Sequence, residues 1–76
     1  MIPHEIIIKD LFDMFKAKKL EINCVIAYDK AGDHVAIVKD YFSFDLVMDI
    51  GKIAKKHKLL FIIMGDRDKA KIMIYE

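Results

Sequence analysis

The chain repeats itself weakly at an offset of 39 residues, and this repeat restricts the folds that it can adopt. The matching pairs are Asp10/Asp49, Lys16/Lys55, Lys19/Lys58, Leu20/Leu59 and the tripeptides at 29–31 and 68–70. Each copy, at about residues 4–39 and 43–76, has the periodicity of a helix followed by two strands that flank an acidic turn. The sequence therefore predicts one αββ unit written twice within a single domain, residues 1–76.

Two segments have the period of an amphipathic helix. In the first, predicted over residues 4–19, apolar residues from Ile7 to Phe15 share one face, and Pro3 suits the first helical position. In the second, predicted over residues 44–58, Ser43 is the expected N-cap. Lysines close both segments, where positive charge is favourable beside the negative end of the helix dipole.

Four segments have the features of strands. Leu20 to Asp29 alternates with Leu20, Ile22, Cys24, Ile26 and Tyr28 inward, and residues 35–38 return after an acidic turn. The run Leu59 to Met64 is wholly apolar, which predicts a strand covered on both faces. Residues 70–75 alternate again after the turn at 65–68, which predicts a second hairpin.

These elements predict an α+β fold of order αββαββ, with two helices on one face of a four-stranded antiparallel sheet. The order is also that of a ferredoxin-like βαββαβ fold whose first strand has moved to the end of the chain. Such a permutation predicts the spatial strand order 3-4-2-1, with the repeats related by a pseudo-twofold axis. A different sheet order of the same elements is the alternative. A twofold axis normal to the sheet would place the two acidic turns at opposite ends.

The size of the chain favours a partner subunit. A chain of 76 residues buries only about 60% of its unfolded surface, and a single cysteine provides no disulfide framework. That lone cysteine, and the absence of a signal peptide or a long apolar span, predict a cytoplasmic protein without a membrane contact. Abundant Lys and Ile with few amides fit a thermophile, although nine Asp against three Glu weaken that interpretation.

The outward face of the predicted sheet is the main candidate site. Val25, Ala27, Val38 or Ile37, Met73 and Tyr75 should point away from the helices, together with part of the 59–64 strand. A sheet face open to water normally alternates to polar residues, so this face predicts an interface with a second copy of the chain. Open edge strands offer another route to assembly. An RNA-stacking platform would need more aromatics than Tyr75, with Phe61 or Tyr41 as uncertain additions.

Two groups of lysines are candidate nucleic-acid contacts. They are Lys16, Lys18 and Lys19 in the first repeat, and Lys52, Lys55, Lys56 and Lys58 in the second. Their spacing would let them contact phosphates, but a solvated helix face explains them equally simply, and the net charge is only +1. No glycine-rich phosphate loop accompanies them, so the sequence predicts no nucleotide cofactor.

The acidic turns and the histidines give weak signals of chemistry. Asp29 and Asp33 in one turn, and Asp66 and Asp68 in the other, could bind a hard cation if a neighbouring subunit brought them together. Ordinary hairpin turns are also rich in Asp. Cys24 is expected in the core, and His4, His34 and His57 lack zinc-site spacing. Asp33-His34 has no nucleophile nearby in sequence. We therefore assign no catalytic residue, no metal and no cofactor.

Three functional hypotheses follow from these observations. The first is a small non-catalytic interaction module that acts as a homo-oligomer, most simply a dimer. The second is a nucleic-acid-binding protein that uses the lysine-rich helix ends. The third is a metal-dependent hydrolase whose Asp residues meet across subunits.

Overall fold

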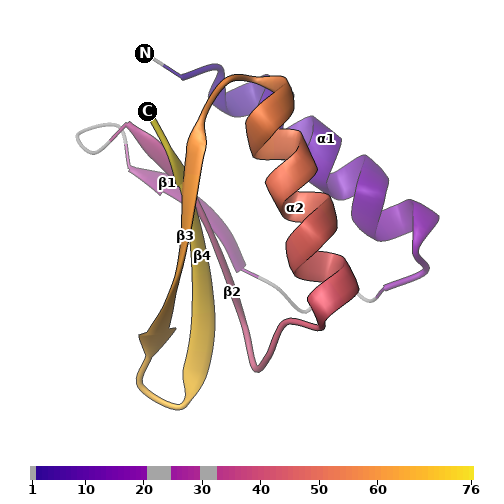
Figure 1. The fold of residues 1–76 in the computed structure, drawn as a ribbon, viewed down its shortest axis with the longest axis vertical. Helices are drawn as coiled ribbons and strands as arrows, with labels where there is room; N and C mark the ends of the chain where they lie inside the picture. Colours follow the sequence, from indigo (N-terminus) through magenta and orange to yellow (C-terminus); the bar gives the residue numbers. More distant parts are fainter. Residues whose placement is uncertain (1, 21–24, 30–32) are drawn as a thin grey trace.

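The computed structural model describes residues 2–20, 25–29 and 33–76, and contains two helices packed on one side of an antiparallel sheet (Figure 1). In chain order the elements are α1 (His4–Ala17), β1 (Val25–Asp29), β2 (His34–Lys39), α2 (Phe44–Lys56), β3 (Leu60–Asp66) and β4 (Lys69–Tyr75). Neighbouring strands pair in the order β1-β2-β4-β3. The predicted α+β class, with two helices and an antiparallel sheet, is confirmed.

The helices begin where the sequence predicted and end two residues early. Ser43 caps α2, because its Oγ accepts a hydrogen bond of 3.2 Å from the Leu46 N–H. Pro3 occupies the N-cap position of α1 rather than the first helical position. Both helices stop at a lysine in the left-handed region, Lys19 with φ 55° and Lys58 with φ 58°.

The two helix ends are copies of each other at the 39-residue offset. The Leu20 N–H donates to the Phe15 carbonyl at 3.0 Å, and the Leu59 N–H donates to the Ala54 carbonyl at 2.9 Å. The left-handed lysine of each end donates to the carbonyl three residues before it, at 3.0 Å in both cases. This pair of bonds is the Schellman motif, which satisfies the last carbonyls of a helix and turns the chain sharply. It explains why each lysine-rich tail leaves the helix.

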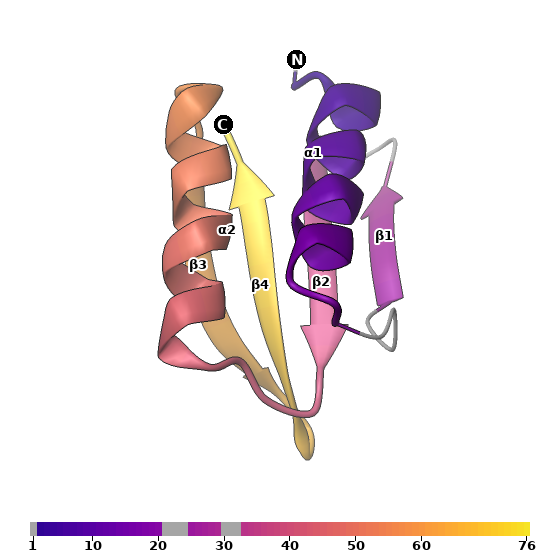
Figure 2. The same cartoon turned by 90° about the vertical axis from the view of Figure 1, so that its right-hand side faces the viewer.

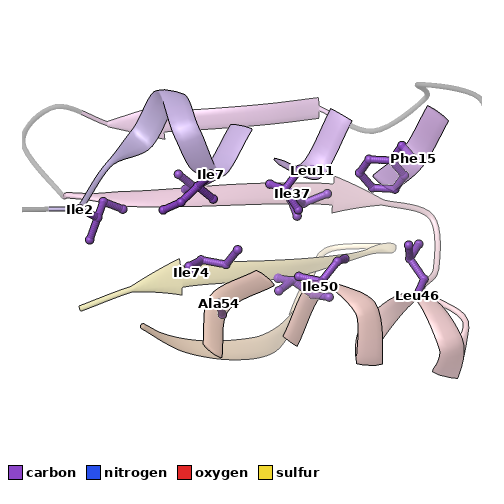
Figure 3. Close-up of a cluster of buried hydrophobic side chains, with 11 residues drawn as sticks. Ile2, Ile7, Leu11, Phe15, Ile37, Leu46, Ile50, Ala54 and Ile74 are labelled. Carbon is purple, nitrogen blue, oxygen red and sulfur yellow. The ribbon is translucent and has the colours of Figure 1, made fainter. Parts of the chain in front are cut away.

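The core lies between the helices and the two central strands. α1 contributes Ile7, Leu11 and Phe15, and α2 contributes Leu46, Ile50 and Ala54, so that buried positions also recur at the offset of 39 (Figure 3). The sheet contributes Val35, Ile37, Ile72 and Ile74. All ten are 3% exposed or less, which leaves one continuous apolar cluster.

Strand alternation decides which side chains face away from the helices. Val35 and Ile37 of β2 are fully buried, so the neighbouring Val38 points outward. On β4 the buried pair Ile72 and Ile74 leaves the positions of Lys71, Met73 and Tyr75 on the outward face. The register then places Leu60, Ile62 and Met64 of β3 beside those β4 residues.

The prediction that the 59–64 segment is covered on both faces is wrong. β3 is an edge strand, and its four residues from Leu60 to Ile63 are each between 38% and 59% exposed. A continuous apolar run is typical of a strand with cover on two faces. Such a run does not indicate whether that cover comes from the same chain, and here the chain supplies only part of it.

The first predicted strand is only partly described. β1 begins at Val25, and Leu20 lies outside it, half-buried against the core. Ile22 and Cys24 lie outside the described residues, so the predicted inward position of Cys24 stays a prediction. Ile26 and Tyr28 pair with Ile37 and Val35, which places them at inward register positions.

The ends of the two layers separate the two hairpins. Figure 2 shows α1 and α2 running in opposite directions, α2 with β3 at one side of the molecule and β1 at the other. β2 starts at the end that holds the N-terminus, whereas the β3–β4 turn lies at the far end. Asp33 and Asp68 are therefore at opposite ends of the chain.

Candidate interaction surfaces

The outward face of the sheet carries the residues predicted for an interface. Val38, Met73 and Tyr75 occupy outward positions on the central strands, and each is half-buried. Val25 and Ala27 pair with Val38 and Ala36, but their side chains lie outside the described part of the structure. The described members of this group form adjacent rows on β2 and β4.

Three β3 residues extend this surface to the sheet edge. Leu60 and Ile62 are 59% and 43% exposed, and Met64 is half-buried beside them. We name the set Val38, Leu60, Ile62, Met64, Met73 and Tyr75 the outward patch. Sequence analysis placed part of the 59–64 strand here without choosing residues. The register with β4, which a single sequence does not reveal, makes the choice.

The aromatic residues needed for base stacking are not gathered on this face. Phe61 pairs with the buried Ile74, which places it on the helix side of the sheet. Tyr41 lies in the connection after β2 and is 74% exposed. Tyr75 is the one aromatic at an outward position among the described residues of β2, β3 and β4. Because a stacking platform uses two or three aromatics, this face suits apolar packing better.

A second exposed apolar group lies on α2. Phe44 and Met48 are 77% and 48% exposed, and they lie on the flank of the helix that turns away from α1. Sequence analysis missed them. A signal was present, because both fall outside the apolar stripe of α2 and still carry large apolar side chains.

The seven candidate lysines divide into paired and unpaired groups. Lys18, Lys52 and Lys56 bind acidic residues of the two helices. The others, for which the described residues provide no acidic partner, are Lys16, Lys19, Lys55 and Lys58. Since the helices are antiparallel, these four lysines lie in two groups at opposite ends of the helix layer (Figure 2).

Two ion pairs cross between the helices in a reciprocal arrangement. The Lys18 Nζ lies 2.5 Å from Asp49 Oδ2, and the His57 Nε2 lies 2.9 Å from Asp10 Oδ2. Asp10 and Asp49 are 39 residues apart, and so are Lys18 and His57. The repeat thus extends to the pairs that join its two halves. His57 acts as a partner of an acid, as a rim histidine would.

These contacts shift the pKa values of the acids. The hydrogen bond with His57 holds the pKa of Asp10 below its ordinary value, and Lys56 at 3.3 Å acts in the same direction. The hydrogen bond with Lys18 lowers the pKa of Asp49 and raises the pKa of Lys18. The groove between the helices is therefore a network of satisfied charges, which is typical of a structural role.

The acidic turns do not form a metal site within the described chain. Within residues 2–20, 25–29 and 33–76, no group of three or more His, Cys, Asp or Glu residues could hold an ion. Asp33 instead accepts a hydrogen bond of 3.2 Å from the Ile2 N–H and lies 3.7 Å from His4 Nε2. These contacts tie the N-terminal segment to the start of β2.

Comparison with known proteins adds no functional assignment. No protein-family model matches the chain, and no curated protein matches it significantly in sequence. Among the described residues, neither helix is long and apolar enough to span a bilayer. The inference of function therefore rests on the surfaces described above.

Proposed function

We propose that the chain is a small non-catalytic interaction module that acts as a homo-oligomer. The observation that carries this proposal is the outward patch, an apolar surface on the side of the sheet that no described helix covers. A single-layer exposure of this kind is typical of an interface. Val25 and Ala27, which pair with outward residues of β2, are expected to complete the patch.

The size of the domain supports the same proposal. Folding of so short a chain leaves a small free energy of unfolding, about 4–11 kcal/mol at typical values per residue. Transfer of apolar surface from water contributes roughly 25 cal/mol for each Å² buried. A second copy packed on the outward patch therefore adds stability that the monomer lacks.

The test is the mass of the protein in solution. We expect sedimentation velocity at low micromolar concentration to give at least twice the chain mass of 8.9 kDa. Met73→Lys places a charge in the middle of the outward patch and should shift the protein toward the monomer. Ile6→Lys, which changes a 55% exposed residue on α1, is the matched control and should leave the mass unchanged. A wild-type protein that stays monomeric would contradict the proposal.

We also propose that the αββαββ order is a circularly permuted ferredoxin-like arrangement with internal pseudo-twofold symmetry. The support comes from the strand order β1-β2-β4-β3 and from the recurrence of core positions, helix ends and cross-helix pairs at one offset. An ancestral αββ unit paired with itself would have this arrangement. In that case, the present chain already contains one self-association in covalent form.

A second candidate function is nucleic-acid binding through the helix ends. The specific observation is that Lys19 and Lys58 occupy the left-handed position where Gly is preferred, and have no acidic partner among the described residues. Binding through phosphates would weaken steeply with salt. Retardation of DNA or RNA at low salt would support this candidate, and its absence at micromolar protein would exclude it.

The hydrolase hypothesis has the least support. It requires Asp33 and Asp68, which lie at opposite ends of one chain, to meet across subunits. Titration calorimetry with Mg²⁺ and Mn²⁺ tests it, because a competent site releases or absorbs heat on binding.

A further inference from the structure

We propose that β3 and the adjoining flank of α2 form a twofold contact between two copies of the chain, joined edge to edge. This inference rests on the proposed function, since it specifies one of the surfaces by which the chain would associate with itself. It differs from packing on the outward patch, because the partner strand would lie beside β3 in the same sheet. Two chains would then share an eight-stranded sheet.

The exposed apolar side chains gather at this edge of the molecule. Six of the nine large apolar residues that are exposed among the described ones lie on α2 or β3. They are Phe44, Met48, Leu60, Phe61, Ile62 and Ile63. Figure 2 shows α2 lying over β3 at one side, so these residues wrap around a single edge. Apolar surface concentrated in this way marks an association site.

Exposure on both sides of β3 separates edge pairing from face packing. The register places Leu60 and Ile62 on the outward side, whereas Phe61 and Ile63 lie on the helix side at 38% and 49% exposure. A second sheet stacked on the outward patch would leave the helix-side pair in water. A strand added along β3 covers side chains on both sides at once, as β-augmentation does.

The edge of β3 also lacks the features that normally prevent such pairing. It contains no Lys, Arg or Pro, and its one acidic residue, Asp66, is the last in the strand. The pair Asp66 and Lys69 closes a two-residue hairpin, and such a pair exchanges backbone hydrogen bonds, as does every second pair after it. The N–H and C=O groups of Phe61, Ile63 and Gly65 are therefore directed at the open edge.

The sequence of β3 is complementary to itself in antiparallel orientation. A twofold axis through Ile62 pairs Phe61 with Ile63 of the second copy and Leu60 with Met64, so that every contact is apolar against apolar. The edge-directed groups of Phe61 and Ile63 would exchange hydrogen bonds across the axis. The α2 flanks would approach each other on the helix side, where Phe44 and Met48 project.

The first repeat provides an internal comparison. At the offset of 39 residues, Phe44 and Met48 correspond to Glu5 and Lys9 of α1. The same position in the same kind of helix is thus charged in one repeat and apolar in the other. Both of the charged residues are exposed, as expected of a helix flank in water. The apolar pair on α2 therefore serves a need that the helix itself does not have.

Gly51 shows that α2 and β3 are fitted to one another at this edge. A Cβ atom at Gly51 would lie 3.0 Å from Cε1 and Cζ of Phe61, closer than ordinary van der Waals contact. The corresponding residue of α1 is Phe12. The missing side chain on α2 lets the Phe61 ring fill that space from the strand and remain at the surface.

The experiment transfers the charges of the first repeat to the second. Phe44→Glu combined with Met48→Lys reproduces Glu5 and Lys9, side chains that the equivalent helix positions already accommodate. Glu also suits the first turn of a helix. We expect the dissociation constant of self-association, from sedimentation equilibrium, to rise at least about 30-fold, as for loss of an interface hot spot. Circular dichroism should show unchanged helix and strand content.

Two further variants make the result decisive. Ile63→Lys adds a charge to the helix side of the edge and should also weaken association, while Ile6→Lys should not. If the wild type is monomeric, both this contact and the proposed function are wrong. If the wild type associates, and Met73→Lys disrupts it while Phe44→Glu/Met48→Lys does not, the edge contact is wrong and the proposed function stands.

Discussion

Replacing the two left-handed lysines by glycine should make the protein more stable. Lys19 and Lys58 have φ values of 55° and 58° and each occupies the C′ position of a Schellman motif. A residue with a Cβ is strained by roughly 1–2 kcal/mol in this conformation. Glycine adopts it without strain but loses more conformational freedom on folding, which offsets about 0.5–1 kcal/mol. The net gain is about 0.5–1 kcal/mol for each site.

The two gains should add. The motifs lie at opposite ends of the antiparallel helices, and sites that are far apart with no shared partner contribute independently. Lys19→Gly/Lys58→Gly should therefore raise the free energy of unfolding by about 1–2 kcal/mol. For a domain of this size, 1 kcal/mol corresponds to a shift in Tm of about 4–8 °C.

Urea unfolding followed by circular dichroism measures the gain, at one fixed protein concentration for all variants. Lys56→Gly is the matched control, because Lys56 is the last residue of α2 proper and glycine there should destabilise the helix by up to about 1 kcal/mol. Two glycine variants that are neutral or less stable than the wild type would refute the strain argument. The same proteins test the second functional candidate, which requires weaker nucleic-acid binding when either lysine is removed.

Two other predictions concern the core and the cross-helix pairs. Leu11→Ala and Ile50→Ala remove fully buried side chains at equivalent positions of the two repeats, so each should cost about 2–5 kcal/mol in urea unfolding, and an unequal cost would argue against equivalent packing. Because the pKa of Asp10 is held low by His57, this acid stabilises the fold above its unfolded pKa near 3.8, and that stability is lost as pH falls through the folded value. Asp10→Asn should therefore flatten the fall in urea midpoint below about pH 4, and a variant with the wild-type acid profile would show that Asp10 has no such effect.

Much of the fold follows from local pattern. The 3.6-residue period and the cap at Ser43 located both helices, because each helix has one wholly apolar face and a polar opposite face. The repeat located the equivalent core positions without reference to long-range contacts. The predicted ends were two residues too long, since a lysine in the left-handed region is rare and the sequence pattern alone favours continuing the helix.

The candidate site was less accessible to prediction. Val38, Met73 and Tyr75 were placed outward correctly by the period of two, but β3 was interpreted as a covered strand because all of its first residues are apolar. Exposure of a strand depends on its neighbours in space, and its hydrophobicity is the same whether its own chain or another one covers it. For the same reason Phe44 and Met48 were overlooked, although a comparison of the two repeats distinguishes them from Glu5 and Lys9.

The two repeats share one backbone plan and differ in what they present at the sheet edges. Equivalent helix ends, core positions and cross-helix ion pairs show that the internal halves have kept the contacts that hold them together. The divergence is concentrated on the flank beside β3, where charge has been replaced by Phe44 and Met48, and on Gly51, which admits Phe61. A duplicated unit needs only one such flank to associate with a copy of itself through a twofold axis, because that contact is isologous. A charged flank beside β1 then restricts growth at the other edge, so the assembly closes as a dimer at β3 and does not extend strand by strand into a fibre.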